Sequence, residues 1–293
     1  LALFRQLMMI QPAGYASYVE TDQFAICSAS PELFFDLDDH QLITRPMKGT
    51  ATRGLTLSTD QEQSNRLQNS LKDRAENLMI VDMMRNDLGR ISSPGSIKVP
   101  KLFEVEKYPT VWQMTSTVSS QTQASFSEIL TALFPSASIT GAPKVQTMKI
   151  ITDLENSPRK IYTGTIGYLS PNRKAQFNVA IRTVLIDKWS GTSEYGVGSG
   201  VVWDSVDQLE FEECMVKAKI LTEPYPNFSI FESLLWENKN YFLLAYHLDR
   251  LHNSAKYFDF PIDVSLIEKR LLELSKTLSA AEENKPHKIR LVL

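Results

Sequence analysis

The sequence predicts an α+β fold, in which antiparallel strands and helices occupy separate stretches of one chain. Residues 161–169, 176–186 and 194–202 alternate apolar and polar side chains and are separated by turn-forming residues, a pattern typical of an antiparallel meander. Residues 58–89 instead repeat apolar side chains at helical spacing. With 293 residues and 43% hydrophobic content, the chain can bury the core of one large domain or of two ordinary ones.

The composition argues against several classes of function. A net charge of −3 provides no positive field for a polyanion, so nucleic acid is not an expected partner. No apolar run is long enough to span a membrane and no signal peptide opens the sequence, so no membrane partner is expected. Cys27 and Cys214 stand far apart without metal-ligand spacing, which predicts a cytoplasmic protein without disulfides. The sequence begins at Leu1 and stops inside a strand-like run, so we expect both ends to be cut.

The first 45 residues are expected to form a short helix followed by strands. The predicted elements are a helix over 3–11 and strands over 15–19, 23–28 and 41–45. Glu32 follows a proline and precedes three large apolar residues. Apolar surroundings raise the pKa of a carboxyl group, so Glu32 is a candidate general acid. A glutamate at a strand edge that faces water is the alternative.

Lys48 is a candidate nucleophile. Pro46 fixes the backbone before it, and Gly49 lets the backbone after it approach a ligand. A lysine that is desolvated in a cleft can lose its proton and attack carbon. A solvated lysine in a turn is the commoner outcome for such a segment alone, and the other motifs of the chain favour the cleft.

Residues 58–89 predict one long amphipathic helix. Ser58 and Thr59 offer overlapping capping boxes at its start, and Gly89 a C-terminal stop. Its predicted buried stripe consists of Leu67, Leu71, Ala75, Leu78, Val81 and Leu88. Asp73 and Glu76 lie three residues apart on one face of this helix. Two carboxylates so placed repel each other unless a cation lies between them, which makes them candidate metal ligands, and a solvated acidic patch is the alternative.

The middle of the chain combines two expected strands, a short helix and a loop of small residues. The strands cover 97–99 and 110–118, and a capping box at Ser125 and Glu128 opens a helix that Pro135 ends.

The loop of small residues, 134–144, is the most specific stretch of the sequence. It runs into Pro143, a favoured first helical residue, and Thr140 lies within it. The free N–H groups of the following helix can hold an anion such as a carboxylate. That helix is expected to bury Val145, Met148, Ile151 and Leu154.

Arg182 stands in an otherwise apolar run. Because its charge cannot be removed by deprotonation, it must pair with a carboxylate, either of the protein or of a ligand. Further along, Gly198 and Gly200 end the third alternating segment and permit close approach of the backbone to a ligand.

A last helix, capped by Ser205 with Gln208, is expected to carry a second acidic pair, Glu210 and Glu213. For Glu213, an ion pair with Lys217 on the same helix is the simpler interpretation.

The motifs, in their order along the chain, resemble those of the chorismate-binding enzymes over about residues 1–222. The resemblance rests on segments 30–32, 45–50, 76–90, 138–144 and 198–205. Within that family, the motif with a lysine at position 48 resembles that of the aminodeoxychorismate synthases, component I. Anthranilate synthases carry a small residue at this position. The resemblance implies a β-sandwich wrapped by helices.

The resemblance also implies how substrate and metal are held. Mg²⁺ would bind the ring carboxylate of chorismate, and hard oxygen ligands suit that ion. The matching metal ligands are Asp73, Glu76, Glu210 and Glu213. The positions that match those gripping the substrate's carboxylates are Thr140, Tyr162, Arg182, Gly198, Ser199, Gly200 and Lys217.

The reaction implied is the conversion of chorismate and ammonia to 4-amino-4-deoxychorismate, toward p-aminobenzoate and folate. Glu32 would protonate the departing 4-hydroxyl while a neutral Lys48 attacks the ring at C2. Ammonia, supplied by a glutamine amidotransferase partner, would then enter at C4 and expel the lysine. Two other interpretations remain: an anthranilate or isochorismate synthase, and a non-catalytic fragment that only binds the glutaminase partner.

The chain departs from its apparent relatives in three respects. Gln113 stands where many of them have histidine, so no titrating group is assigned there. Asp73 replaces a glutamate of the anthranilate-type enzymes, which shortens the reach to the metal. An N-terminal portion of the relatives is absent from this sequence, so the core is expected to be incomplete.

Residues 228–293 resemble the start of aminodeoxychorismate lyase, a fold-type IV pyridoxal-phosphate enzyme, and residues 223–227 are expected to form a linker. Arg250 matches the arginine that grips the cofactor phosphate. The lysine for the Schiff base would lie beyond this sequence, so pyridoxal phosphate and lyase activity are expected only of a complete module. A small α+β appendage is the alternative.

Overall fold

The structure is a computed structural model that describes residues 1–203, 205–222, 226, 228–280 and 285–293. The chain divides into two compact units, one formed by residues 1–52 with 64–225 and the other by residues 53–63 with 226–293. Of the predicted linker 223–227, only Pro226 lies within the described residues.

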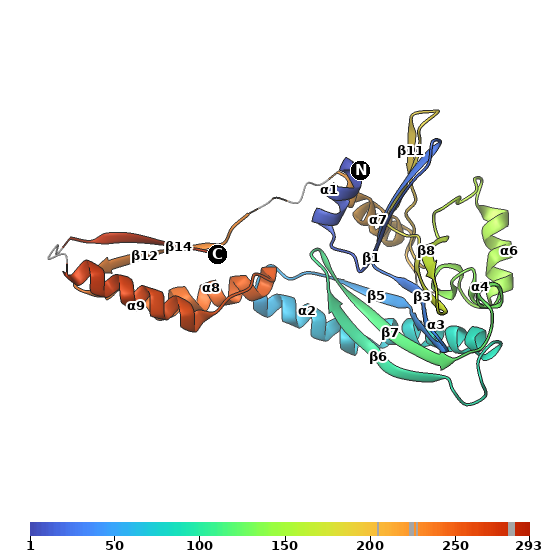
Figure 1. Ribbon diagram of the computed structural model, residues 1–293, viewed down its shortest axis with the longest axis horizontal. Helices are drawn as coiled ribbons and strands as arrows, with labels where there is room; N and C mark the ends of the chain where they lie inside the picture. The colour runs from blue at the N-terminus through green and yellow to red at the C-terminus, as the bar shows by residue number, and fades with distance from the viewer. Residues whose placement is uncertain (204, 223–225, 227, 281–284) are drawn as a thin grey trace. The chain divides into compact units, whose positions relative to one another are not determined.

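The described strands of the first unit form two antiparallel sheets (Figure 1). The smaller sheet has the order β1-β2-β10-β11, with β1 (Tyr15–Glu20), β2 (Phe24–Ser30), β10 (Thr183–Asp187) and β11 (Thr192–Tyr195). The larger sheet has the order β5-β7-β4-β3-β9-β8, and β6 pairs with β7. Its strands are β3 (Leu33–Asp38), β4 (Gln41–Arg45), β5 (Met47–Thr52), β6 (Lys98–Lys107), β7 (Val111–Gln121), β8 (Thr165–Ser170) and β9 (Lys174–Val179). Asn178 of β9 links the sheets, because its side-chain amide donates a 2.8 Å hydrogen bond to the carbonyl of Tyr15.

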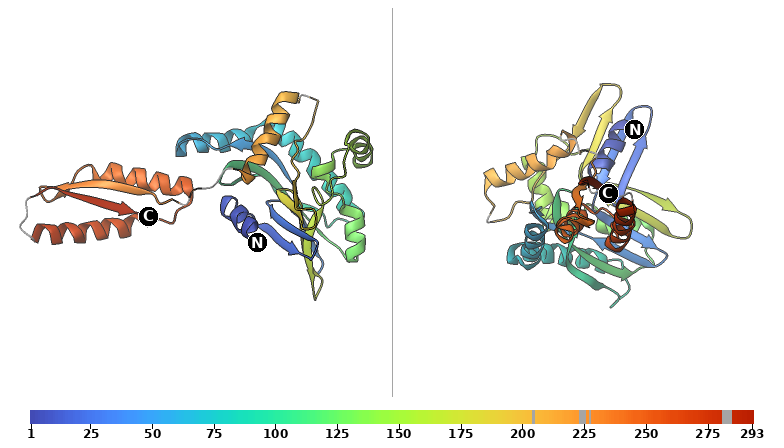
Figure 2. Two further views of the ribbon diagram at one scale, coloured as in Figure 1. Left: turned by 90° about the horizontal axis from the view of Figure 1, so that it is seen from above. Right: turned by 90° about the vertical axis from the view of Figure 1, so that its left-hand side faces the viewer.

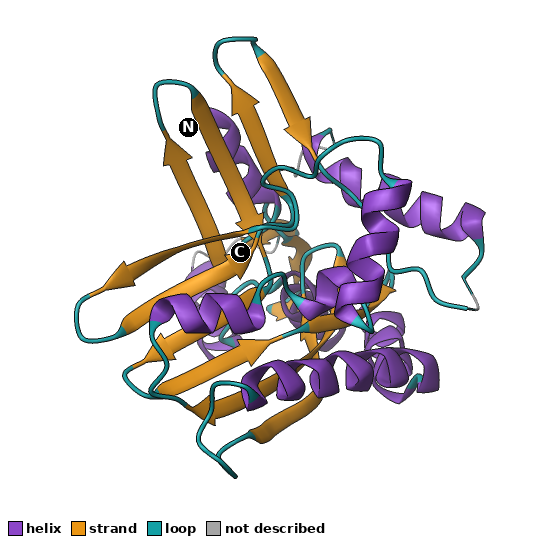
Figure 3. Ribbon diagram, turned by 90° about the vertical axis from the view of Figure 1, so that its right-hand side faces the viewer, coloured by secondary structure: helices purple, strands orange, loops and turns teal. Residues whose placement is uncertain are grey.

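Helices lie beside these strands (Figure 3). They are α1 (Ala2–Ile10), α3 (Leu71–Gly89), α4 (Phe126–Leu133), α5 (Ala137–Thr140), α6 (Lys144–Leu154), α7 (Asp207–Ala218) and the 3₁₀ helix η1 (Lys219–Leu221). Helix α2 (Leu57–Asn69) contains residues of both units.

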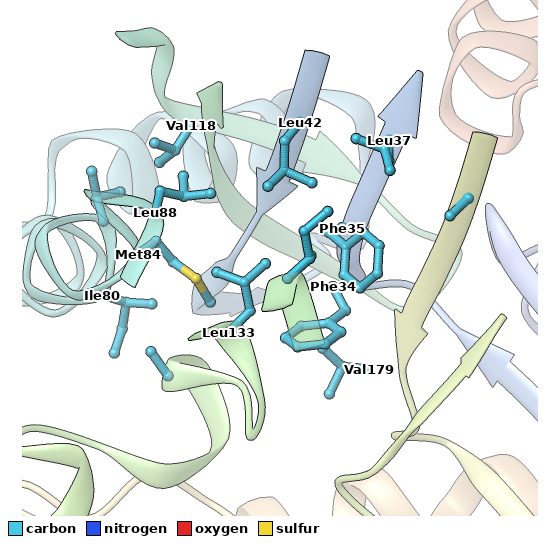
Figure 4. Packing of buried hydrophobic residues seen from close by; sticks show 14 residues of the cluster. Phe34, Phe35, Leu37, Leu42, Ile80, Met84, Leu88, Val118, Leu133 and Val179 are labelled. Atoms are coloured by element: carbon cyan, nitrogen blue, oxygen red, sulfur yellow. The ribbon is translucent and has the colours of Figure 1, made fainter. Parts of the chain in front are cut away.

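The main core of the first unit lies where α3 and α4 meet the larger sheet (Figure 4). Its largest side chains are Phe34, Phe35, Leu42, Ile80, Met84, Leu88, Ile129 and Leu133. Phe34 and Phe35 are both buried although they are neighbours in β3, because the register of β3 with β4 shifts between Leu33 and Asp36. Glu32 precedes this buried strand and is only 3% exposed.

Several predicted elements are confirmed. The predicted helix 3–11 and strands 15–19, 23–28 and 41–45 correspond to α1, β1, β2 and β4. Helix α4 begins with the predicted capping box, in which Ser125 and Glu128 each bond the other's backbone N–H.

The predicted single helix over 58–89 is wrong, because Ser70 separates two helices. Thr56 caps α2, where its hydroxyl and that of Thr59 exchange bonds with each other's backbone N–H, so Ser58 is not the cap. Ser70 then caps α3 by accepting a hydrogen bond from the backbone N–H of Asp73 at 3.3 Å.

The predicted apolar stripe of this region is also partly wrong. Leu71 and Leu78 are 83% and 44% exposed. The buried face of α3 is formed instead by Asn77, Ile80, Val81, Met84, Asp87 and Leu88. Leu71 and Leu78 lie in the same helix as these residues but on a different face, so the predicted stripe combined residues of two faces.

The predicted strand 176–186 is two strands that belong to different sheets. β9 ends at Val179 and β10 begins at Thr183. Between them Arg182 has a φ of +49°, a conformation unusual for a residue with a side chain. Arg182 is therefore at a corner between the sheets rather than inside a strand. The strand predicted over 194–202 likewise ends at Tyr195.

The predicted buried face of α6 is wrong. Within the described residues α6 buries none of its side chains, and Val145 and Leu154 are 69% and 74% exposed. Pro143 is the N-cap rather than the first helical residue. The predicted cap of α7 is wrong as well, because Val206 is the N-cap and the Ser205 hydroxyl donates to the Glu210 carboxylate at 2.7 Å.

The second unit has its own small core. Its strands are β12 (Phe231–Glu237), β13 (Asn240–Tyr241) and β14 (His287–Val292), in the order β13-β12-β14. Alternate residues of β12 are buried, so one face of the sheet packs against helices α8 (Leu244–Phe258) and α9 (Val264–Ala280), as Figure 2 shows. Leu234 and Trp236 of the sheet belong to the same buried cluster as Leu251 and Leu271 of the helices.

Both units combine antiparallel sheets with helices, so the predicted α+β class is confirmed. In the part of the chain that the structure describes, every helix is too short or too polar to cross a membrane.

Candidate active site

Lys48, the predicted nucleophile, is held by its backbone against α3. The Asn77 side-chain amide donates to the carbonyl of Lys48 at 3.2 Å, and Ser116 donates to the other end of that amide at 2.5 Å. Gly49 has a φ of +102°, and a Cβ there would lie 3.1 Å from the Cβ of Asp73. Glycine is thus required for β5 to approach α3 this closely.

The Lys48 amine faces the loop of residues 196–200, called here the glycine-rich loop. Its Nζ lies 2.9 Å from the place where a Cβ on Gly200 would be, so any larger residue would push the amine away. Among the described residues Nζ has no hydrogen bond or ion pair, although its charge acts on both Glu32 and Glu76. The amine is therefore near the predicted acid and the predicted metal ligands.

Glu32, the predicted general acid, is buried. Burial raises the pKa of its carboxyl group to about 7, although a hydrogen bond from Ser138, the charge of Lys48 and the backbone of Met47 all oppose that rise. The Ser138 hydroxyl donates to Oε1 of Glu32 at 2.6 Å. A carboxyl group with this pKa holds its proton for much of the time near neutral pH, as a general acid requires.

The two predicted acidic pairs come from α3 and α7. Burial raises the pKa of Glu76, and the charges of Asp73 and Glu210 raise it further, while Lys72 and Lys48 lower it. Glu210 of α7 therefore lies close enough to Glu76 of α3 for its charge to act on that carboxyl group. The hydrogen bond from Ser205 lowers the pKa of Glu210, whereas Glu213 forms a 2.6 Å ion pair with Lys217.

The donor chemistry of this site suits a hard cation. Among the described residues no three His, Cys, Asp or Glu side chains gather closely enough to hold a metal ion by themselves. Mg²⁺ commonly keeps water or substrate among its ligands, so one or two carboxylates suffice to hold it. Glu76 and Glu210 are the best placed, because a cation would relieve their repulsion.

Arg182 has the environment of an anion-binding residue. Its Nη1 is buried and has no hydrogen-bond partner among the described residues, and no ion pair to a described carboxylate compensates it. Burial lowers the pKa of Arg182, while the nearby Tyr195 and Tyr108 raise it. No described protein carboxylate pairs with Arg182, so a ligand carboxylate stays the prediction for its partner.

The glycine-rich loop packs on Tyr162. A Cβ on Gly196 would lie 2.2 Å from the Tyr162 ring, and one on Gly198 would lie 2.8 Å from its hydroxyl. Lys217 donates to the carbonyl of Gly198 at 2.8 Å, so its amine is engaged with the loop as well as with Glu213. Ser199 bonds Glu210, which ties the loop to α7.

The remaining predicted residues have local partners. The Thr140 hydroxyl donates to the carbonyl of Ser136 at 3.1 Å. Gln113, the residue found in place of histidine, is 7% exposed and accepts a 3.2 Å hydrogen bond from Thr50.

Three residues of this region received no role from the sequence: Asn77, Ser138 and Tyr195. Ser138 belongs to the small-residue loop that was singled out, but its partner Glu32 lies 106 positions away. Burial raises the pKa of Tyr195 to about 12, while the charge of Arg182 lowers it.

In the second unit, Arg250 is already paired. Its Nε and Nη2 donate to the two carboxylate oxygens of Glu232, which also bonds His247 at 2.7 Å. The predicted phosphate contact of Arg250 therefore has only its remaining nitrogen available, and the sequence did not indicate Glu232.

Comparison with known proteins assigns the two parts to families. The family described as chorismate binding enzyme matches residues 1–223, and amino-transferase class IV matches residues 229–293. Aminodeoxychorismate synthase component 1 of Salmonella typhimurium is 42% identical, over 76% of this chain and 49% of that protein. Its namesake in Escherichia coli is 44% identical, over 73% of this chain and 47% of that protein.

A solved structure is also similar to the first part of the chain. Anthranilate synthase component I from Streptococcus pneumoniae is 32% identical with a TM-score of 0.68, over 75% of this chain and 49% of that chain. This chain thus spans about half the length of the relatives that it matches. Because the match over residues 1–223 covers more than half of the sequence, the chain belongs to the chorismate binding enzyme family.

Proposed function

We propose that this chain carries the chorismate-converting part of an aminodeoxychorismate synthase, which makes 4-amino-4-deoxychorismate toward p-aminobenzoate and folate. The observation that carries the proposal is the proximity of the Lys48 amine to a buried carboxyl group, Glu32, whose pKa is raised to about 7 by burial. Replacing a hydroxyl group by nitrogen needs a nucleophile and an acid at one site. The names of the relatives from Salmonella and Escherichia support the same activity.

In the first step, the amine of Lys48 forms a bond to C2 of chorismate. Both ring double bonds shift by one position, and the bond from C4 to its hydroxyl breaks. Glu32 gives its proton to that hydroxyl, which leaves as water, and the carboxylate of Glu32 remains. Lys48 releases one of its own protons to solvent as it becomes a secondary amine.

In the second step, ammonia attacks C4 and the bond between C2 and Lys48 breaks. Both double bonds return to their original places, and the departing amine of Lys48 takes up a proton. The adding nitrogen loses one, so the product carries a neutral or protonated amino group at C4. Two displacements leave that amino group on the position that the hydroxyl occupied.

Substrate binding follows from the charges around Lys48. Chorismate is a dianion, and Arg182 would pair one of its carboxylates through the buried Nη1 that lacks a protein partner. Tyr162, Thr140 and the backbone of residues 198–200 would position the rest. Mg²⁺, held by Glu76 and Glu210 with Asp73 and Glu213 nearby, would neutralise the other carboxylate.

Partners and compartment belong to the same proposal. Free ammonia is scarce at neutral pH, so a glutamine amidotransferase subunit would supply it. The free Cys27 and Cys214 fit a reducing cytoplasm. Residues 229–293 would form part of a pyridoxal-phosphate module, although Arg250 bonds Glu232 through two of its nitrogens, so no step is assigned to that cofactor.

Product identification tests the proposal. A protein containing this chain, given chorismate, Mg²⁺ and an ammonium salt, should yield 4-amino-4-deoxychorismate by chromatography, and Lys48→Ala should abolish its formation. Anthranilate or isochorismate as the product would replace the proposal by one of the alternative chorismate enzymes. Absence of turnover in the wild-type protein, with chorismate still bound, would favour a non-catalytic role.

A further inference from the structure

Ser138 contacts the carboxyl group of Glu32 directly. It lies in α5, is 7% exposed, and donates to Oε1 of Glu32 at 2.6 Å. Both residues are buried, so the hydrogen bond is shielded from water. Once Glu32 has lost its proton, this hydrogen bond to a charged group in such surroundings is among the stronger ones in proteins.

The direction of the Ser138 hydroxyl is fixed by a second serine. Ser136, 3% exposed, lies with its hydroxyl oxygen 2.9 Å from that of Ser138. A hydroxyl has one proton, and Ser138 gives its proton to Glu32. Ser136 must therefore be the donor in the bond between the two serines, and this bond keeps the Ser138 proton aimed at the carboxylate.

The backbone of Glu32 is held independently of Ser138. Its N–H donates to the Ser30 hydroxyl at 3.2 Å, and its carbonyl accepts from the N–H of Val179 at 3.1 Å. Ser30 in turn donates to the carbonyl of Val179 at 2.6 Å. Ser138 therefore acts on the side chain of Glu32 alone.

We propose that Ser138 is the positioning residue of the general acid: it binds Oε1 of Glu32, leaves Oε2 to carry the proton, and stabilises the carboxylate that remains after proton transfer. The proposal rests on the proposed function, because it assumes that Glu32 protonates the leaving hydroxyl. Ser138 transfers no proton itself. Its hydrogen bond strengthens as negative charge develops on Glu32, so it favours the transition state.

The proposal predicts a shift in pH dependence with a defined sign. Glu32 acts in its protonated form, so adduct formation should fall as pH rises through a pKa near 7. The Ser138 bond lowers that pKa, as do the amine of Lys48 and the backbone of Met47, and the ring of Tyr108 also lies close. Removing the Ser138 hydroxyl while leaving the others should raise the pKa and move the alkaline limb to higher pH.

The test uses single-turnover formation of the Lys48 adduct, followed by intact mass, in a full-length protein with Mg²⁺ and chorismate. Ser138→Ala should slow the step about tenfold to a hundredfold, the loss of one hydrogen bond to a charged group, with KM nearly unchanged. The alkaline limb should move upward. Ser138→Thr keeps the hydroxyl and should restore both properties. Ser127→Ala, at an exposed position of α4, is the matched control and should change neither.

A double mutant separates this proposal from the function on which it rests. If Ser138 acts through Glu32, Ser138→Ala should have little effect in a Glu32→Gln background. An undiminished effect there, or a slower step with an unmoved alkaline limb, would overturn the role of Ser138. A Glu32→Gln variant that forms adduct at the normal rate would overturn the acid role of Glu32 itself. If Ser138→Ala is inactive, infrared titration of the Glu32 carboxyl still decides, because an unraised pKa contradicts the proposal.

Discussion

Glu32 of the first unit and Glu232 of the second are buried to nearly the same extent, with exposed fractions of 3% and 4%. Their pKa values nevertheless move in opposite directions. Burial raises the pKa of Glu32 to about 7. The hydrogen bond from Arg250 lowers the pKa of Glu232, and His247 lowers it further.

The difference lies in what covers each carboxyl group. Glu32 is enclosed by uncharged groups and one hydroxyl donor, with the Lys48 amine as a nearby but unbonded cation. Glu232 is covered by the two basic side chains that bind it, and the Arg250 side chain is itself 67% exposed. For Glu232 the bond from Arg250 outweighs the effect of burial, whereas for Glu32 burial remains the largest influence on the pKa. Glu32 is suited to acid chemistry, whereas Glu232 is suited to an ion pair.

The largest expected effect comes from removing the acid. Glu32→Gln should slow formation of the Lys48 adduct about a hundredfold to ten-thousandfold, the usual contribution of general acid catalysis. Glu232→Gln should leave that rate unchanged, because Glu232 belongs to the other unit and to an ion pair. Single-turnover mass spectrometry of both variants checks this, and equal losses in the two would contradict the contrast.

The next effect is on the stability of the first unit. The ordinary pKa of glutamate, 4.5, applies to the unfolded chain, and the folded value is about 7. The contribution of Glu32 to the free energy of unfolding is therefore fully present below pH 4.5 and is lost as pH rises through 7. The loss is on the order of 3 kcal/mol at pH 8. Glu32→Gln avoids this loss, so urea midpoints should favour the variant more at pH 8 than at pH 5. A constant difference would show that burial does not raise this pKa.

Arg250→Met should destabilise the second unit by about 1–3 kcal/mol, because it leaves Glu232 buried with one partner. The contribution of Glu232 to stability depends on pH with the opposite sign to that of Glu32. Since the pKa of Glu232 is lowered, its ion pair contributes above pH 4.5 and is lost as pH falls through the folded pKa. Hydrogen exchange in β12 and α8 should show the defect at pH 7 and lose it in acid. A defect of equal size in acid would mean that Arg250 acts by packing.

The smallest effect is expected from His247→Ala, which removes the weaker of the two partners of Glu232. The loss should be about 1 kcal/mol, one hydrogen bond, and Arg250 remains to hold the carboxylate. The same hydrogen-exchange measurement applies. A loss larger than that of Arg250→Met would reverse the order of the two partners.

The sequence predicted those elements whose signals are local. Strands β1, β2 and β4 have alternating patterns, and α4 has its capping box within four residues. The break at Ser70 was missed because no Gly or Pro marks it. The corner at Arg182 was missed because a positive φ is expected at glycine rather than at arginine. The exposed apolar side chains of α6 show that periodicity identifies an apolar face but not what covers it.

The candidate site divides in the same way. Lys48 and Glu32 could be predicted as site residues because Pro46, Gly49 and the apolar residues after Glu32 are adjacent to them in sequence. Asn77 and Ser138 were missed because their partners lie 29 and 106 positions away, and no local pattern encodes such contacts. The ion pair between Glu213 and Lys217 could be predicted from sequence, because the two residues are spaced by about one helical turn.

The covalent adduct is the central claim and can be measured directly. A full-length protein containing this chain, incubated with chorismate and Mg²⁺ but without ammonia, should gain the mass of chorismate less one water, and peptide mapping should locate the gain at Lys48. Addition of an ammonium salt should remove the adduct and release 4-amino-4-deoxychorismate. Steady formation of that product with no adduct at Lys48 under any of these conditions would contradict the account.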